Sequence, residues 1–273
     1  MKKTLTLTLI IGLFVMGFYF YFNRIGRLTP SVNETFISSP HIPVAFDGVR
    51  IVQISDLLIR RESCVTLLEN TVEAVNRLEP EIIVFTGNLF LPEGLEFEAE
   101  VSELLSSFDA SLARIAVFGY YDTGDLEHFQ RVQETFEAAG FINLINERIE
   151  IFNQAPEGIN FIGATADMSR TSLDALLDAY MHEDRFNLLL LSTPTFTGTS
   201  VMRGVDFQLS GHCLGTRASA DNQASPCFQF YRGIYQFSDQ ITLNVSTGLA
   251  RFHTTSGFRQ QPSIDSFLLI REE

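Results

Sequence analysis

With 273 residues, the chain is long enough for one large domain or two small ones, and 45% apolar residues supply material for a packed core. The formal net charge is -14, with 33 acidic side chains against 19 lysines and arginines. A surface this acidic repels phosphate backbones, so nucleic acid is disfavoured as a partner and we expect none.

Residues 1–27 are predicted to be a transmembrane signal anchor. Lys2 and Lys3 precede an apolar run from Leu5 to Phe22, and about 18 apolar residues suffice to cross a bilayer as a helix. No small-residue cleavage pattern follows the run, which favours an uncleaved anchor over a removed signal peptide. The basic residues on its two sides nearly balance, and we expect a cytoplasmic amino terminus with the domain outside. The sequence therefore predicts a single-pass membrane protein with an extracytoplasmic domain.

Residues 28–45 are predicted to be an extended tether, because Pro30, Pro40 and Pro43 interrupt regular structure there. The folded domain is expected to cover residues 46–273. No internal repeat or low-complexity segment divides this region.

Within the domain, apolar segments of strand length alternate with helical patterns. Strands are predicted at 50–54, 82–86, 115–118, 158–162 and 187–191, with helices at 64–78, 99–108, 126–139 and 172–179 between them. Short strands follow at 207–209, 228–231, 242–245 and 266–270, and no helix is predicted after Pro194. This order predicts an α/β fold with largely parallel sheets and a strand-rich carboxy-terminal part.

The three cysteines form no zinc-binding pattern. Cys213 and Cys227 could form a disulfide if the domain is exported to an oxidising compartment. Unpaired thiols in a buried setting are the interpretation that the sequence favours.

Short polar or glycine-containing motifs follow several predicted strands. They are Ser55-Asp56-Leu57-Leu58, Gly87-Asn88, Gly119-Tyr120-Tyr121-Asp122, Ser192-Thr193-Pro194 and Ser210-Gly211-His212-Cys213-Leu214-Gly215. In open α/β sheets, ligands bind at the carboxyl ends of strands, so these motifs are expected to meet at one sheet edge.

The order and spacing of these motifs resemble the calcineurin-like metallophosphoesterases, in particular a membrane-anchored branch. The signatures of that family are D-x-H, G-D, G-N-H-D, a lone His and G-H-x-H. The resemblance runs from about Phe46 to the end, and the segments 51–56, 80–87 and 231–235 agree with it outside the site. It implies a four-layer α-β-β-α sandwich of two mixed sheets. It also implies two divalent metals (Mn, Fe or Zn) that activate a hydroxide to hydrolyse phosphate esters.

The resemblance also implies which positions would carry the chemistry, and most of them depart from the family pattern. The residual metal-ligand candidates are Asp56, Asn88 and His212. Ligand positions are lost at Leu58, Tyr120, Ser192 and Leu214, while Tyr121 stands at the general-acid position and Asp122 is retained beside it. Because an uncharged amide bridges two cations poorly, no metal is expected at full occupancy.

The replacing side chains are predicted to fill the former metal pocket, since Leu58, Leu214, Tyr120 and Tyr121 gain burial energy there. A stacking role of the two tyrosines on a ligand is the alternative. Asp56 and Asp122 are interpreted as carboxylates that hold turns, with residual metal binding as the alternative. His212 is interpreted as a hydrogen-bonded loop histidine, and we expect Asp56→Asn to change stability only slightly.

The sequence favours a catalytically impaired, membrane-anchored pseudo-phosphoesterase with a binding or structural role. Its partner, besides the membrane, would be a phosphorylated ligand or a protein. The alternative is an active metal-dependent hydrolase of phosphate esters, or of lipid or nucleotide pyrophosphates, that uses a reduced or rearranged site of Asp56, Asn88, Asp122 and His212. Whether the chain is an enzyme is therefore left open by the sequence.

Overall fold

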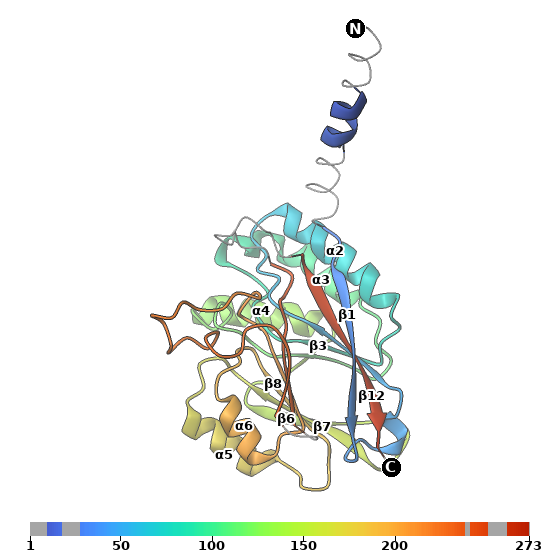
Figure 1. Cartoon of the computed structure of the whole chain (residues 1–273), viewed down its shortest axis with the longest axis vertical. Coiled ribbons are helices and arrows are strands. Elements are labelled where there is room, and N and C mark those ends of the chain that lie inside the picture. The colour runs from blue at the N-terminus through green and yellow to red at the C-terminus, as the bar shows by residue number, and fades with distance from the viewer. Residues whose placement is uncertain (1–9, 18–27, 238–240, 251–260, 273) are drawn as a thin grey trace.

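The computed structural model of the chain describes residues 10–17, 28–237, 241–250 and 261–272 (Figure 1). Within these ranges, two six-stranded sheets pack face to face, and helices cover their outer faces. This arrangement confirms the predicted four layers of helix, sheet, sheet and helix.

The first sheet has the strand order β1-β12-β2-β3-β4-β5. Its strands are β1 (Ser31–Ser39), β12 (Ser263–Arg271), β2 (Arg50–Ile54), β3 (Ile82–Phe85), β4 (Ala113–Ala116) and β5 (Ile142–Asn143). Strands β2 to β5 are parallel, β12 is antiparallel to β2, and β1 is parallel to β12. Its outer face packs against α2 (Glu62–Asn76), α3 (Glu98–Ser106) and α4 (Leu126–Ala138).

The second sheet has the order β10-β11-β9-β8-β7-β6. Its strands are β10 (Gly233–Gln236), β11 (Thr242–Val245), β9 (Phe207–Ser210), β8 (Asn187–Leu191), β7 (Gly158–Ala164) and β6 (Glu147–Phe152). The four central strands are parallel, and β10 and β6 are antiparallel to their neighbours. Helix α5 (Arg170–Tyr180) packs on the outer face, with α6 (Thr197–Arg203) beside it.

The largest buried regions follow from strands that are apolar on both faces. Ile51 and Val84 point toward the second sheet, while Val52 and Ile54 point toward the helices. Phe207 reaches back from the second sheet into the core between the sheets. Coverage on both sides explains why these strands appear in the sequence as continuous apolar runs.

The predicted tether contains a strand of the domain. Residues 31–39 form β1, which pairs with β12 from Ser31 opposite Ser263 to Ser39 opposite Arg271. The sequence did not indicate this strand because β1 is an edge strand with one exposed face. Ile37 is buried, whereas the neighbouring Phe36 is 71% exposed, so the segment lacks the apolar run of a central strand.

Three other local predictions were wrong. The strand predicted at 228–231 is a loop, and β10 begins at Gly233 instead. A helix does follow Pro194, since α6 covers Thr197–Arg203 between two residues in the left-handed region, Phe196 and Gly204. Strands β5 and β6 were not predicted, because β5 is very short and all residues of β6 except Ile151 are exposed or only partly buried.

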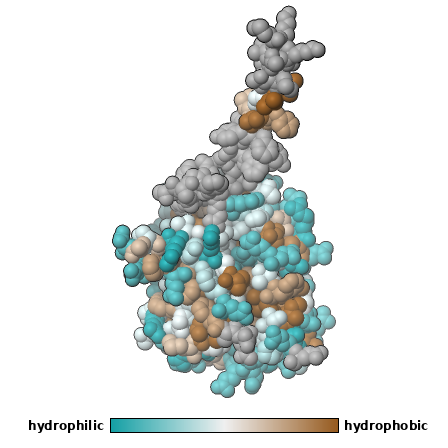
Figure 2. Space-filling model, viewed as in Figure 1, coloured by the Kyte–Doolittle hydropathy of each residue, from teal (hydrophilic) through white to brown (hydrophobic). Residues whose placement is uncertain are grey.

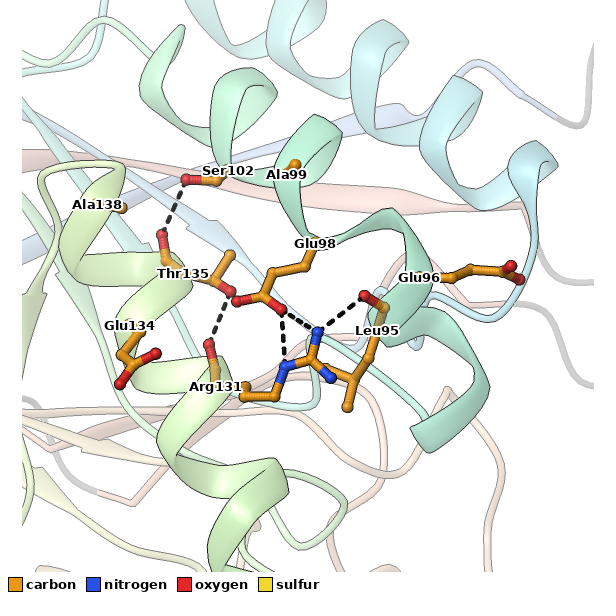
Figure 3. A pocket seen from close by; sticks show the side chains of 9 residues that line it. All are labelled: Leu95, Glu96, Glu98, Ala99, Ser102, Arg131, Glu134, Thr135 and Ala138. Atoms are coloured by element: carbon orange, nitrogen blue, oxygen red, sulfur yellow. Dashed lines mark hydrogen bonds and ion pairs between the residues drawn. The ribbon is translucent and has the colours of Figure 1, made fainter.

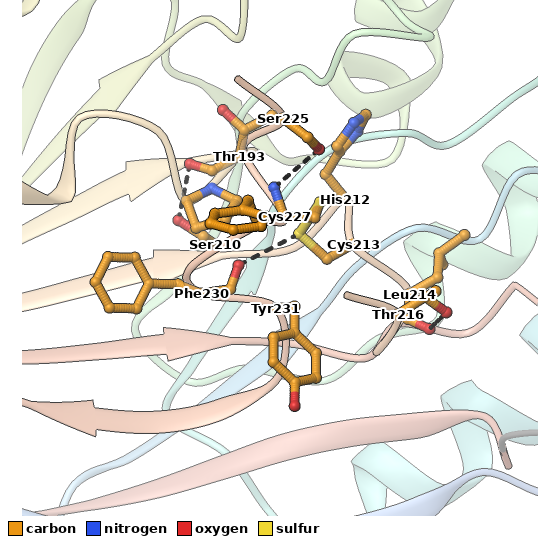
Figure 4. The surroundings of a disulfide bond; sticks show 12 residues. Thr193, Ser210, His212, Cys213, Leu214, Thr216, Ser225, Cys227, Phe230 and Tyr231 are labelled. Carbon is orange, nitrogen blue, oxygen red and sulfur yellow. Dashed lines mark hydrogen bonds between the residues drawn. A yellow bond between two sulfur atoms is a disulfide. The ribbon is translucent and has the colours of Figure 1, made fainter. Parts of the chain in front are cut away.

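Cys213 and Cys227 form a disulfide, contrary to the favoured sequence interpretation (Figure 4). Their Cα atoms lie 5.4 Å apart, within the range that a disulfide requires. The bond closes the long loop between β9 and β10 and packs against Leu243 and Val245 of β11. Cys64 is free and half-buried.

Of the predicted anchor, residues 10–17 are described and the rest lies outside the described residues. These residues are helical, and their large apolar side chains are exposed and among the most hydrophobic on the surface (Figure 2). In the described part of the chain, no helix has both the length and the apolarity to cross a membrane.

Candidate site at the sheet edge

The predicted motifs meet at one edge of the two sheets, where β2, β3, β4, β8 and β9 end. The backbone N–H of Asp56 donates to the carbonyl of Gly87 (3.0 Å), which joins the loops after β2 and β3. The backbone N–H of His212 donates to Oδ2 of Asp56 (2.7 Å), which joins the two sheets. Asp56 and His212 are therefore neighbours, as the sequence predicted.

The carboxylate of Asp56 is occupied by hydrogen bonds from within the chain. Its Oδ1 accepts from the side-chain amide of Asn88 (2.7 Å), and its Oδ2 accepts from the Ser55 hydroxyl (2.8 Å) as well as from His212. Burial raises the pKa of Asp56, and these three hydrogen bonds act in the opposite direction. Both oxygens thus have internal donors, and the group that faces Oδ1 is an amide N–H₂.

Asn88 lies at the centre of the site and joins three loops. Its side chain is buried, its Nδ2 donates to Asp56, and its Oδ1 accepts from the backbone N–H of Tyr121 (3.0 Å). The amide therefore donates with its N–H₂ group and accepts with its oxygen, a combination that a carboxylate cannot provide. A carboxylate in this place would keep the contact to Tyr121 and lose the one to Asp56.

Asp122 organises the loops rather than facing a ligand. Its Oδ2 accepts from the backbone N–H groups of Asn88 (2.6 Å) and Gly119 (2.8 Å), and its Oδ1 from that of Leu89 (3.0 Å). Burial raises the pKa of Asp122 to about 6, although these three donors favour the ionised form. This geometry supports the interpretation of Asp122 as a turn-holding carboxylate.

The backbone of the site is strained at the positions implied to hold metal. Positive φ angles occur at five of these positions, namely Asp56 (54°), Leu58 (47°), Asn88 (64°), His212 (71°) and Leu214 (47°). Left-handed backbone is unfavourable for side chains other than Gly, Asn and Asp, and it persists where the surrounding structure imposes it. The loops therefore retain a demanding conformation at Leu58 and Leu214, although leucine side chains bind no metal.

Two glycines allow the loops to approach this closely. A Cβ atom on Gly119 would lie 2.2 Å from Oδ1 of Asn88, and one on Gly211 would lie 2.0 Å from the Ser55 hydroxyl oxygen. Neither neighbour can withdraw without breaking the Asp56–Asn88 network. These positions consequently require glycine for packing.

Tyr120, Tyr121 and His212 form an aromatic cluster above the Asp56–Asn88 pair. Ring centroids are separated by 5.7 Å for the two tyrosines, and by 6.4 Å and 6.2 Å from His212 to Tyr120 and Tyr121. Tyr120 is 64% exposed and Tyr121 is 40% exposed, so the prediction that they fill a pocket was wrong. The rings lie on the surface because the backbone of their loop is held below them by Asp122.

The other positions implied to have lost ligands differ in environment. Leu58 is buried, as predicted, whereas Leu214 is only half-buried. The Ser192 hydroxyl is buried and has no hydrogen-bond partner among the described residues, and the same holds for Nδ1 of His212. The imidazole of His212 extends away from the neighbouring disulfide (Figure 4).

The donor set does not fit a dinuclear metal centre. Asp56, Asn88 and His212 are the residues that could contribute, and the first two are hydrogen-bonded to each other. An amide N–H₂ that points at the carboxylate occupies the side from which a cation would approach. Among the described residues, no group of three His, Cys, Asp or Glu side chains has a geometry that could hold a metal ion.

Sequence reasoning missed two polar residues that support the site. The Ser55 hydroxyl is a donor to Asp56, as given above. Gln53 is buried between the sheets, donates to Thr86 (2.9 Å) and to the carbonyl of Ser210 (2.9 Å), and accepts from Asn244 (2.8 Å). A polar residue inside an otherwise apolar strand was the available signal for Gln53.

A depression of about 470 Å³ lies away from this edge, between α3 and α4 (Figure 3). Arg131 crosses it and pairs with Glu98, and it also donates to the carbonyl of Leu95 (3.3 Å). The polar groups that Figure 3 connects by dashed lines therefore satisfy each other, and we assign no ligand to this depression.

Comparison with curated proteins finds relatives among phosphoesterases. Over 261 aligned residues the chain is 26% identical to a Bacillus subtilis (strain 168) protein described as "Uncharacterized metallophosphoesterase YkuE", covering 93% of this chain and 90% of the relative. It is 33% identical over 75 residues to the UDP-2,3-diacylglucosamine pyrophosphatase LpxG of Chlamydia muridarum, covering 28% of this chain and 23% of that protein. No protein-family model matches the chain.

Similar solved structures include the NAD nucleotidase NadN of Haemophilus influenzae, with a TM-score of 0.49 and 11% identity over 74% of this chain and 45% of that one. A dimetal phosphatase from Danio rerio gives a TM-score of 0.48 and 14% identity, covering 74% of this chain and 88% of that one.

Proposed function

Since the chain belongs to the calcineurin-like metallophosphoesterase family, we propose that it is a membrane-tethered, non-catalytic member of it. Its role in this proposal is to bind a phosphorylated ligand or a protein partner, or to serve as a structural element of the cell envelope. The fold positions the loops of a phosphoesterase, while the side chains on those loops contact each other.

The hydrogen bond from Asn88 to Asp56 carries this proposal. In a dinuclear phosphoesterase, two cations must be held by anionic and neutral donors, and a shared carboxylate offsets their mutual repulsion. Here the central position supplies an amide that donates 2.7 Å from Oδ1 of Asp56, in a fully buried setting. Replacing this contact by a metal would leave a buried amide N–H₂ without an acceptor, which is unfavourable.

One observation favours a second candidate function, a hydrolase with a single metal. Nδ1 of His212 is buried without a hydrogen-bond partner among the described residues, and the backbone N–H of the same residue donates to Asp56. An imidazole and a carboxylate are both metal ligands, but two protein donors are fewer than stable single-metal sites use. Asp122 does not join this set, because its oxygens hold three backbone N–H groups.

The tether in this proposal is the apolar run from Leu5 to Phe22, with the domain in an extracytoplasmic compartment. The run has the length and composition of a membrane span. The disulfide between Cys213 and Cys227 supports the compartment, because such bonds persist in oxidising environments.

Metal content and turnover of the purified full-length chain test the proposal. We expect Mn, Fe and Zn well below one per chain, and no hydrolysis of p-nitrophenyl phosphate or of its bis-ester above the rate of an Asp56→Ala variant. Near-stoichiometric metal, together with turnover that disappears in both Asp56→Ala and His212→Ala, would establish the hydrolase instead.

A further inference from the structure

The candidate site and the start of the domain lie at the same edge of the first sheet. Ser31, the first residue of β1, is paired with Ser263 of β12. The N–H of Ser263 donates to the carbonyl of Gly248 (3.1 Å), and Leu249 donates to the carbonyl of Ser55 (3.0 Å). Because β2 lies two strands from β1, Asp56 is roughly 10 Å from the point where the chain enters the domain. Figure 1 shows the arrowheads of β1 and β12 at the opposite end.

The chain between the apolar run and β1 is short. Phe22 and Ser31 are nine residues apart in sequence, and nine residues span at most about 30 Å when fully extended. If the run crosses the bilayer, the edge that carries the site cannot move farther than this from the membrane surface. A short tether also keeps the local concentration of lipid at this edge high.

Large apolar or aromatic side chains are exposed at this edge, on the segment that runs from the end of β4 to the first residue of α4. Tyr120 and Tyr121 are 64% and 40% exposed, and Leu126, the first residue of α4, is 72% exposed. Tyrosine has an apolar ring and a polar hydroxyl, and it favours the headgroup level of a bilayer. The charged side chains on either side of Leu126 are the exposed Asp125 and Glu127, so this segment does not favour an anionic surface.

We propose that this edge of the domain lies on the bilayer surface, with Tyr120, Tyr121 and Leu126 at the headgroup level. The aromatic cluster above Asp56 and Asn88 then faces lipid headgroups rather than bulk water. This inference rests on the membrane tether of the proposed function and adds the orientation of the domain.

The absence of tryptophan from the chain allows a direct test. We would reconstitute the full-length Tyr120→Trp variant into phosphatidylcholine vesicles whose acyl chains are brominated close to the headgroups. Phe152→Trp is the matched control, since Phe152 is 50% exposed and pairs with Gly158 at the opposite edge. We expect bromination to remove about half of the emission of Tyr120→Trp and to leave that of Phe152→Trp unchanged. Leu126→Trp is a second reporter, with the same expected result.

Flotation of the same vesicles separates failure of the inference from failure of its premise. A full-length chain that does not float with the vesicles contradicts the tether itself. A chain that floats, but whose Tyr120→Trp and Leu126→Trp emission is no more quenched than that of Phe152→Trp, overturns the orientation alone. In that case the cluster faces away from lipid and is available to a protein partner.

Discussion

Asn88 and Asp56 illustrate how one amide determines what a pair of buried side chains can do. The two groups are complementary, because Asn88 donates to Asp56 on one side and accepts from the Tyr121 backbone on the other. The surrounding loops are closed around this pair by Gly119 and Gly211, which leave no room for a Cβ atom. The expectation that Asp56→Asn changes stability only slightly is therefore revised. Both oxygens of Asp56 accept hydrogen bonds, so the N–H₂ group of an asparagine would face a donor whichever way it turned. We expect this substitution to lower the free energy of unfolding by about 1–3 kcal/mol.

Asn88→Asp should destabilise the domain strongly at neutral pH. The change places two buried carboxylates within hydrogen-bond distance, so one of them must take up a proton or the pair must separate. We expect a loss of about 3 kcal/mol or more in the free energy of unfolding at pH 7, and a smaller loss at pH 5, measured by chemical denaturation.

The control for this substitution is Asn146→Asp. The side-chain oxygen of Asn146 only accepts, from the backbone N–H (3.0 Å) and the hydroxyl (3.2 Å) of Thr165, so a carboxylate can replace it. Equal losses in the two variants would contradict the role given to the Asn88 amide.

Asp265 should give the domain a pH dependence of its own. Burial raises its pKa above the ordinary 3.8, and the neighbouring side chains of Ser246, Asn33 and Asn244 act in the opposite direction. Its Oδ1 accepts from Asn33 (2.9 Å). The native state therefore binds this proton more tightly than the unfolded state does. Its contribution to stability is fully present below the ordinary pKa and is lost as the pH rises through the raised value.

Asp265→Asn should remove this part of the pH dependence and leave stability at pH 7 unchanged or higher, because no charge is then buried. Denaturation curves of both proteins between about pH 4 and 7 would measure it. A variant that retains the full pH dependence would show that another group is responsible.

At the level of elements, β1 changes the boundary of the domain. The sequence placed residues 28–45 in a tether, but Ile37 and Ile42 are buried in the core between the sheets. A chain that begins at residue 46 should therefore be less stable than one that begins at residue 28, by at least about 4 kcal/mol, since each lost buried isoleucine costs about 2–5 kcal/mol. Equal thermal unfolding midpoints would mean that β1 adds nothing to the fold.

The disulfide between Cys213 and Cys227 also acts on a whole element, because it closes the long loop between β9 and β10. It joins residues 14 apart, and a loop of about 15 residues gives roughly 3 kcal/mol of stabilisation. Cys213→Ser should lose about this amount in denaturant, whereas Cys64→Ser should lose little. Thiol titration of the unreduced, denatured protein should find one free cysteine, and a count of three would contradict the pairing.

For the whole molecule, the proposal that no metal is tightly held predicts the outcome of a thermal measurement. A ligand that binds the native state at 100 times its Kd adds about 2.7 kcal/mol, which corresponds to roughly 5–10 °C in a domain of this size. We expect a chelator, or added Mn²⁺ or Zn²⁺, to shift the unfolding midpoint by much less than this. A rise of several degrees that disappears in His212→Ala would identify a retained metal site.

The larger elements and the location of the site could be predicted because they depend on local patterns. Strands β2 and β3 are apolar on both faces, and α4 has one apolar face, so their sequences determine them almost alone. Asp56 and His212 could be placed together because the carboxyl ends of parallel strands share an edge. Edge strands such as β1 and β6 carry weaker patterns, since water replaces part of their packing.

The sequence by itself predicted the two mixed sheets, the resemblance to the metallophosphoesterases and the positions that depart from the ligand pattern of that family. Only the tertiary structure decided that Asn88 donates to Asp56, that Cys213 meets Cys227, and that Tyr120 lies on the surface. The physical reason is the distance along the sequence over which each feature is set. Periodicity records which residues are buried, whereas a hydrogen bond, a disulfide or an exposed ring depends on how loops distant in sequence meet in space.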